Sequence, residues 1–296
     1  MTQHARFALY SPEAAEAPDA TGDQWLDLAG VDAQPLSIVA PDGLQVAAWE
    51  LDAEHPGALG LRELVQHETG AGLAALLVPP ALLGSRRSLI VTDVDSTLIE
   101  QEVIELLAAH AGREAEVAAV TERAMRGELD FAESLHHRVK ALAGLPTRII
   151  DEVAEQVVPT AGARELIAAA HARGNRVGAV SGGFIQVLEP LAARLGLDHA
   201  QANVLGVREG VLTGTVEGPV VDRAAKASAL RRWCAADDVN FRRTIGIGDG
   251  ANDLDLLTVA GMGVGIEPKP ALRVAADAVL GLRRLDVLAS ALGWLD

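Results

Sequence analysis

Two acidic residues follow an apolar run in residues 88–98, whose sequence is SLIVTDVDSTL. The β-branched run predicts a strand that is buried on both faces. Asp93 and Asp95 lie two residues apart, so both carboxylates are expected on one side at the strand's carboxyl end. Thr97, with Glu100 three residues later, predicts a capping box that opens a helix. Such a segment suits a phosphate group and a divalent cation, although an ordinary strand-to-helix corner capped by Asp95 or Ser96 stays open.

Three further segments carry residue types that bind phosphate or metal. Residues 181–183, with sequence SGG, follow an apolar run, and their glycines let a phosphate oxygen approach the backbone closely. The turn 248–253, with sequence GDGAND, places Asp249 behind another apolar run. Lys226 lies between these two segments on a predicted helix. Considered alone, it would be a solvated surface charge.

Composition limits the class of protein. The chain has 296 residues, of which 49% are hydrophobic and 22% charged, so we expect one large globular domain with additions. A formal net charge of −16 argues against non-specific binding to nucleic acid or to anionic membranes. The one cysteine, Cys234, cannot form an internal disulfide, and residues 1–20 do not resemble a signal peptide. We therefore expect a cytoplasmic protein.

Helical and strand patterns alternate after the acidic strand. Residues 98–157 show helical periodicity almost throughout, which predicts a helical insert that can form a lid. The following alternation predicts an α/β fold with a parallel sheet and helices on both faces. Strands are predicted at 176–180, 202–207, 211–216, 244–247, 262–266 and 278–280, with helices at 163–173, 185–195, 224–235, 254–260 and 272–276. The residues expected to meet at the carboxyl edge of this sheet are Asp93, Asp95, Ser181 and Asp249.

Residues 1–87 carry no cluster of catalytic residue types. We predict strands at 36–40 and 44–51 joined by an Asp42-Gly43 turn, a helix at 60–67 and a strand at 72–78. Pro79-Pro80 and Arg86-Arg87 predict a linker. The segment is interpreted as a small α+β regulatory or dimerisation module, through which a homodimer could form.

The order of these motifs resembles the haloacid dehalogenase superfamily of phosphohydrolases, and within it the phosphoserine phosphatase family. The motifs are Asp93-x-Asp95 with Ser96-Thr97, Ser181-Gly182-Gly183, Lys226, and Gly248-Asp249-Gly250-x-Asn252-Asp253. Residues 125–131, followed by Ser134-Leu135 and Arg138-Val139, resemble the family's cap motif. The resemblance covers about residues 88–280. It implies a Rossmann-like phosphatase domain over 88–296 with a helical cap near 103–158, preceded by an N-terminal extension over 1–87.

The resemblance implies hydrolysis of O-phospho-L-serine, the last step of serine biosynthesis. Asp93 would be the nucleophile that forms an aspartyl-phosphate. Asp95 would protonate the leaving serine oxygen and then activate water. Asp93, Asp249 and the backbone carbonyl of Asp95 would bind one Mg²⁺, for which Mn²⁺ is an alternative.

The resemblance also assigns the groups of the substrate to separate side chains. Arg138 would pair with the carboxylate and Glu102 with the ammonium group. Met125 and Phe131 would wall the pocket when the cap closes, although both could equally be packing residues. The residues implied to bind the phosphate are Ser181, Gly182, Gly183 and Lys226, with Asn252 near the substrate and Asp253 supporting the metal ligands.

Three other hypotheses about the function stay open. The first is a related phosphatase or phosphotransferase that acts on another small phosphate monoester, such as phosphothreonine or phosphohomoserine. The second is a phospho-accepting signalling module, which also uses an aspartyl-phosphate, Mg²⁺ and a lysine on a parallel sheet. Such modules are shorter and have no large insert after the nucleophile. The third is an amino-acid-binding regulator driven by residues 1–87.

Overall fold

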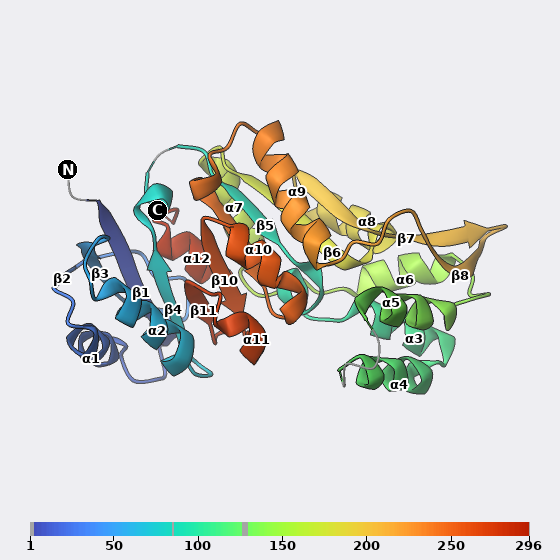
Figure 1. Cartoon of the computed structure of the whole chain (residues 1–296), viewed down its shortest axis with the longest axis horizontal. Helices are drawn as coiled ribbons and strands as arrows, with labels where there is room; N and C mark the ends of the chain where they lie inside the picture. Colours follow the sequence, from blue (N-terminus) through green and yellow to red (C-terminus); the bar gives the residue numbers. More distant parts are fainter. Residues whose placement is uncertain (1–2, 85, 126–129, 296) are drawn as a thin grey trace.

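The computed structural model describes residues 3–84, 86–125 and 130–295, except for the side chains of 121–125. The described strands are β1 (His4–Pro12), β2 (Ala33–Pro35), β3 (Leu44–Asp52), β4 (Ala74–Val78), β5 (Leu89–Thr92), β6 (Arg176–Phe184), β7 (His199–Arg208), β8 (Val211–Glu217), β9 (Thr244–Gly248), β10 (Met262–Ile266) and β11 (Ala278–Leu280). They form one sheet with the order β2-β3-β1-β4-β11-β10-β9-β5-β6-β7-β8. Figure 1 shows this sheet running from the blue N-terminal strands to the β7–β8 hairpin.

The strands from β11 to β7 are parallel, as the alternating pattern predicted. The helices around them are α7 (Ala163–Ala172), α8 (Ile185–Leu195), α9 (Arg223–Ala236), α10 (Leu254–Val259), α11 (Pro270–Arg273) and α12 (Asp286–Ala291). The predicted α/β fold is therefore confirmed. The helix predicted at 272–276 lies slightly earlier, where Pro270 occupies its first turn.

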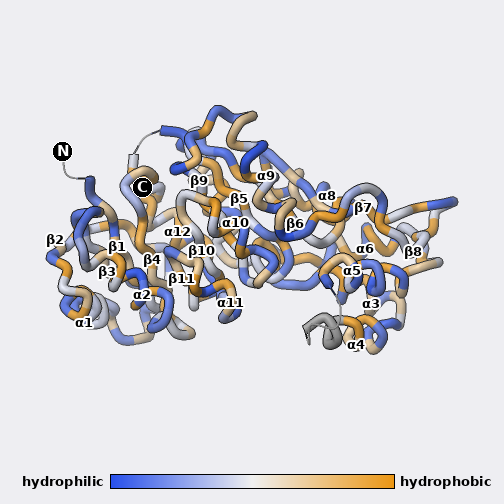
Figure 2. The backbone as a smooth tube through the Cα atoms, viewed as in Figure 1, coloured by the Kyte–Doolittle hydropathy of each residue, from blue (hydrophilic) through white to orange (hydrophobic). Residues whose placement is uncertain are grey.

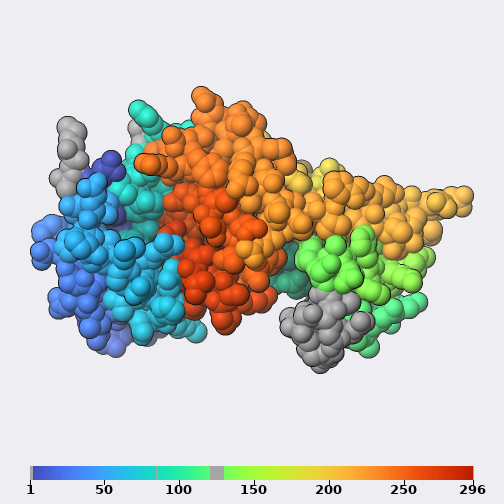
Figure 3. All heavy atoms as spheres, viewed as in Figure 1, coloured from blue at the N-terminus to red at the C-terminus, as the bar shows by residue number. Residues whose placement is uncertain are grey.

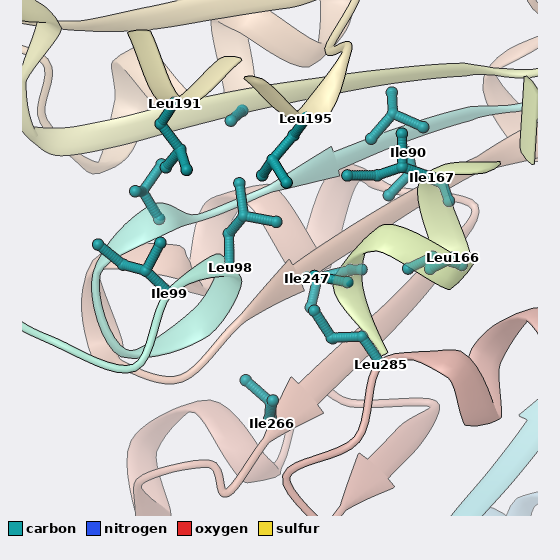
Figure 4. Close-up of a cluster of buried hydrophobic side chains, with 14 of the residues drawn as sticks. Ile90, Leu98, Ile99, Leu166, Ile167, Leu191, Leu195, Ile247, Ile266 and Leu285 are labelled. Carbon is teal, nitrogen blue, oxygen red and sulfur yellow. The ribbon is translucent and has the colours of Figure 1, made fainter. Parts of the chain in front are cut away.

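Alternate residues of β5 point into two different cores, which explains why its whole run is apolar. Ile90 packs in the cluster that includes α7, α8 and α12. Leu89 and Val91 pack in the cluster that includes α9. Figure 4 shows the first cluster, in which Ile90 and Ile247 face side chains of α7 and α8. Figure 2 shows the same pattern, with hydrophobic segments along the central strands.

The insert between β5 and α7 is helical, as predicted. Its helices are α3 (Val103–Ala111), α4 (Glu114–Met125), α5 (Phe131–Lys140) and α6 (Arg148–Gln156). Asp130 and Glu133 form a capping box at the start of α5. The β7–β8 hairpin packs on α5, and an isolated bridge joins Pro146 to Val211. The insert therefore rests on an extension of the sheet, beside the edge where β5, β6 and β9 end (Figure 1).

The predicted capping box of Thr97 and Glu100 is wrong. Residues 94–98 form one tight turn in which Ser96 adopts a left-handed conformation (φ 54°). The next helix, α3, begins only at Val103. Thr97 is fully buried, and its carbonyl accepts a hydrogen bond from Thr160 Oγ1 at 2.7 Å. The acidic residues are thus presented by a turn rather than by a helix N-terminus.

The N-terminal strands extend the central sheet. Strands β1 to β4 alternate with α1 (Asp19–Ala29) and α2 (Ala58–Glu68), and β4 pairs antiparallel with β11. Strand β1 and helix α1 were not predicted. On one face of these strands Phe7 stacks between Trp25 and Trp49. On the other, Tyr10 donates a hydrogen bond from its hydroxyl to Ser290 Oγ of α12 at 2.8 Å. The domain boundary at residue 87 stays a prediction.

The strand predicted at 36–40 is wrong, because these residues lie outside every strand. Leu36 and Ile38 instead pack on the core that includes α12, and the carbonyl of Val39 accepts a hydrogen bond from Ser290 Oγ. Among the described residues, no helix combines the length and the apolar character that a membrane crossing requires.

Candidate active site

A cavity of about 490 Å³ lies at the carboxyl ends of β5, β6 and β9, between the sheet and the helical insert. In Figure 3 the surface is notched between the red C-terminal segments and the green insert. Most of the residues proposed for the site from sequence line this cavity: Asp93, Asp95, Glu102, Phe131, Arg138, Gly182, Gly183, Asp249 and Asn252. Residues almost 160 positions apart therefore meet where the parallel topology predicts a ligand.

Asp93 is held at the floor of the cavity by three neighbours. Its backbone N–H donates to the carbonyl of Ile247 at 2.9 Å, which fixes the end of β5 against β9. Its carboxylate Oδ1 accepts from Val94 N at 2.7 Å. Asn252 Nδ2 lies 3.4 Å from Oδ2. The residue is only 3% exposed, so its carboxylate has a fixed position and little contact with water.

Lys226 lies behind Asp93 and is almost fully buried, with 1% exposure. Its Nζ lies 2.7 Å from Asp93 Oδ1 and 2.7 Å from Asp253 Oδ1. Burial acts to lower the pKa of Lys226, but the two carboxylates outweigh it and raise the pKa. Lys226 is therefore a permanent positive charge beneath the carboxylate of Asp93, and the interpretation of a solvated surface lysine is excluded.

Three buried carboxylates form a cluster that could hold a metal ion. Oxygen atoms of Asp93, Asp249 and Asp253 all lie within 4.8 Å of one another. Both oxygens of Asp253 already accept hydrogen bonds, from Lys226 Nζ on one side and from the N–H groups of Asp249 and Gly250 on the other. Asp93 and Asp249 are therefore the better candidate ligands, and Asp253 orients the turn that carries Asp249.

The electrostatics of the cluster favour a cation. Burial, followed by the charge of Asp93, raises the pKa of Asp253, and Lys226 opposes this. Burial also raises the pKa of Asp249, which Lys269 opposes from 3.0 Å. Crowded carboxylate oxygens are the ligands that Mg²⁺ prefers. The chemistry of the described residues therefore fits a divalent cation between Asp93 and Asp249.

Asp95 occupies a different environment. Its Oδ1 accepts from Val103 N at 2.7 Å and its Oδ2 from Ser181 Oγ at 3.0 Å. Burial, followed by the charges of Glu102 and Asp93, raises the pKa of Asp95 to about 7, although the hydrogen bonds from Val103 and Ser181 oppose this. A carboxyl group with this pKa can both release and take up a proton near neutral pH.

The glycines at the end of β6 permit close contacts. A Cβ atom on Gly183 would lie 2.7 Å from Asp95 Oδ2, and one on Gly182 would lie 2.9 Å from Cζ of Phe131. Phe131 of α5 thus rests directly on the Gly182 backbone, which joins the insert to the sheet. Asn203, which the sequence analysis missed, is buried and donates to the Gly182 carbonyl at 2.8 Å.

Glu102 and Arg138 place opposite charges on one wall of the cavity. Ser96 Oγ donates to Glu102 Oε1 at 2.7 Å and orients this carboxylate. Arg138 donates from Nε to the carbonyl of Ser134 at 3.3 Å. Burial lowers the pKa of Arg138, and Glu102 is the largest opposing influence. The wall therefore offers one site for an ammonium group and one for a carboxylate.

The structure leaves some predicted residues untested and adds others. The side chain of Met125 and the cap residues 126–129 lie outside the described residues. Lys269, which sequence analysis did not consider, lines the cavity beside Asp249. Nothing in the local sequence around Lys269-Pro270 indicates a functional residue, because the importance of Lys269 depends on a contact with Asp249, 20 positions away.

Comparisons with known proteins agree with this geometry. A family model described as haloacid dehalogenase-like hydrolase matches residues 90–258. The chain is 53% identical over 207 residues to phosphoserine phosphatase SerB2 of Mycobacterium tuberculosis, covering 70% of this chain but 51% of that protein. The chain thus spans about half the length of this relative.

Shorter relatives are matched over most of their length. A phosphoserine phosphatase of Streptococcus thermophilus is 46% identical over 190 residues, which cover 64% of this chain and 88% of that protein. A solved structure described as a phospho-aspartyl intermediate analogue of phosphoserine phosphatase is 39% identical, with a TM-score of 0.65, covering 69% of this chain and 97% of that one. The chain therefore belongs to the haloacid dehalogenase-like hydrolases and, within them, to the phosphoserine phosphatase family.

Proposed function

We propose that this protein hydrolyses O-phospho-L-serine to L-serine and phosphate through an aspartyl-phosphate on Asp93. One observation carries the proposal. A single cavity holds a rigid carboxylate backed by a buried lysine, and also the opposite charges of Glu102 and Arg138. These features match the phosphate, the ammonium and the carboxylate of phosphoserine. The relatives named above support this choice of substrate.

In the first step a carboxylate oxygen of Asp93 attacks phosphorus, and the bond between phosphorus and the serine oxygen breaks. Asp95 gives its proton to that oxygen, so L-serine leaves as the alcohol. In the second step water attacks phosphorus, Asp95 takes up its proton, and the bond between phosphorus and the Asp93 oxygen breaks. Phosphate leaves and both carboxyl groups return to their starting state. The pKa of about 7 on Asp95 suits both transfers.

Positive charge is needed around the phosphate oxygens during both steps. Lys226 supplies it from beneath Asp93. Asp93, Asp249 and the backbone carbonyl of Asp95 would hold Mg²⁺, which when bound would offset the phosphate charge. Ser181 Oγ and the N–H groups of Gly182 and Gly183 would bind phosphate oxygens once substrate enters. Asn252, 3.4 Å from Asp93, lies where it can contact the same group.

The cap provides discrimination between phosphate esters. Arg138 can form two parallel hydrogen bonds to the substrate carboxylate, and Glu102 can accept from its ammonium group. Phe131, already seated on Gly182, would exclude water when the pocket fills.

The test is phosphate release from L-phosphoserine, from phosphoethanolamine, which lacks the carboxylate, and from 3-(phosphonooxy)propanoate, which lacks the amine. We expect kcat/KM to fall about 100-fold for each analogue, since each leaves one buried charge unpaired. EDTA should abolish turnover and Mg²⁺ should restore it. Equal turnover of all three esters would remove the roles given to Arg138 and Glu102. It would favour a phosphatase of broader substrate range.

The variants Arg138→Ala and Glu102→Gln separate the two contacts. Arg138→Ala should raise KM for phosphoserine while leaving hydrolysis of phosphoethanolamine almost unchanged. Glu102→Gln should raise KM for phosphoserine while leaving hydrolysis of 3-(phosphonooxy)propanoate almost unchanged, because this ester has no ammonium group to pair with Glu102. A uniform loss on all substrates would indicate that both residues act on folding of the cap instead.

A further inference from the structure

Lys269 lies beside the candidate metal ligand Asp249, in the loop between β10 and α11, and has no part in the mechanism above. Its backbone N–H donates to the carbonyl of Asp249 at 2.8 Å. Its Nζ lies 3.0 Å from Asp249 Oδ2. A Cβ atom on Gly250 would lie 3.7 Å from the same Nζ. The ammonium group therefore sits over the turn that presents Asp249.

The backbone of Lys269 is held rigidly at this place. Prolines flank it on both sides, and Pro270 restricts Lys269 to the extended region that it adopts (φ −62°, ψ 152°). A Cβ atom on Gly265 would lie 2.8 Å from Pro268, so the loop packs tightly on β10. An ordinary surface ion pair has neither feature. The fold thus delivers one ammonium group to one carboxylate.

The two partners differ in exposure, and this difference determines which one can move. The Lys269 side chain is 61% exposed, whereas that of Asp249 is 13% exposed. Burial acts to lower the pKa of Lys269, but Asp249 and, more weakly, Glu102 and Asp253 raise it. The flexible lysine stem can swing into water while the carboxylate stays in the cluster.

We propose that Lys269 is a positioning residue. Its ammonium group binds the Asp249 carboxylate when the divalent cation is absent, and it competes with the cation for this carboxylate. The inference rests on the cation site of the proposed function. A cation that binds Asp249 must displace the ammonium group or bind in its repulsive field. Lys269 therefore weakens cation affinity and keeps the negatively charged turn neutralised until the cation arrives.

The experiment is a calorimetric titration of the metal-free full chain with Mg²⁺ at low ionic strength, with no substrate present. Lys269→Met should bind Mg²⁺ about three- to tenfold more tightly than the wild type, because one adjacent positive charge is removed. Lys269→Arg keeps the charge and should bind within twofold of the wild type. The gain should shrink in high salt, since the ammonium group is largely exposed.

Arg223→Met is the matched control. Arg223 lines the same cavity and pairs with Asp255, which is outside the carboxylate cluster, so its removal should change Mg²⁺ affinity less than twofold. Unchanged or weaker binding by Lys269→Met, in a chain that still hydrolyses phosphoserine, would overturn this inference alone. A wild-type chain that binds no Mg²⁺ would overturn both the cation site and this inference. Normal Mg²⁺ binding with no phosphoserine turnover would overturn only the proposed function.

Discussion

Replacing Lys226 by methionine tests how much the buried ion pairs of the site contribute to stability. The substitution keeps an unbranched side chain, shortens it by one heavy atom and removes its charge. Lys226 Nζ lies 2.7 Å from each of two buried carboxylates, those of Asp93 and Asp253. Breaking a buried ion pair by removing one partner costs about 3–5 kcal/mol, because the remaining charge stays buried and unpaired. With two carboxylates left behind, we expect the upper part of that range.

That loss is a large fraction of the roughly 5–15 kcal/mol by which native proteins are stable. We expect the free energy of unfolding, measured in EDTA by urea titration with tryptophan fluorescence, to fall by about 5 kcal/mol and Tm by roughly 10 °C. Lys140→Met, on an exposed position of α5, is the matched control and should change the free energy of unfolding by less than about 0.5 kcal/mol.

A double-mutant cycle isolates the cause. Adding Asp253→Asn to Lys226→Met removes one of the stranded charges, so the double variant should recover more than about 1 kcal/mol relative to Lys226→Met alone. Mg²⁺ should also stabilise Lys226→Met more than it stabilises the wild type, because the cation can offset the stranded carboxylates. A loss below about 1 kcal/mol for Lys226→Met, or no recovery in the double variant, would show that the ion triad does not hold the site together.

Two further predictions concern pH and the N-terminal strands. The pKa of Asp95 is raised to about 7 in the folded chain, so between about pH 4 and pH 7 the folded state keeps a proton that the unfolded state has lost. This contribution to stability therefore declines as pH rises through that window, and Asp95→Asn should be more stable than the wild type in EDTA at pH 8, by up to about 4 kcal/mol, but not at pH 4. An identical difference at both pH values would contradict the raised pKa. Deleting residues 1–87 removes β4 from the edge of β11 and Tyr10 from Ser290, so the 88–296 fragment should unfold at lower urea and associate through the exposed strand. A fragment as stable and as monodisperse as the full chain would show that the two parts are independent.

Much of the fold could be predicted from sequence because its signals are local. Short apolar runs such as Leu89–Thr92 are buried on both faces, and the glycines and helical periodicity of the insert mark its helices. The strand predicted at 36–40 was wrong because apolar residues can pack on a core without pairing in a sheet. The capping box at Thr97 failed because the left-handed Ser96 turns the chain before any helix begins.

The site was predictable to the extent that its members follow strands. Asp93, Asp95 and Asp249 meet at one edge because the strands before them are parallel. Asn203 and Lys269 were missed because their importance depends on contacts made across the fold. Each lies on an element whose own sequence suggests nothing more than a strand or a turn.

The central claim is that the carboxylate of Asp93 becomes phosphorylated during turnover. The direct measurement is a single turnover with L-phosphoserine, quenched rapidly in acid and reduced with borohydride, which converts an aspartyl-phosphate to homoserine. Peptide mass spectrometry should then find homoserine at position 93 in the wild type and none in Asp93→Asn. Complete release of phosphate with unmodified Asp93 at every quench time, or homoserine at another aspartate, would contradict it.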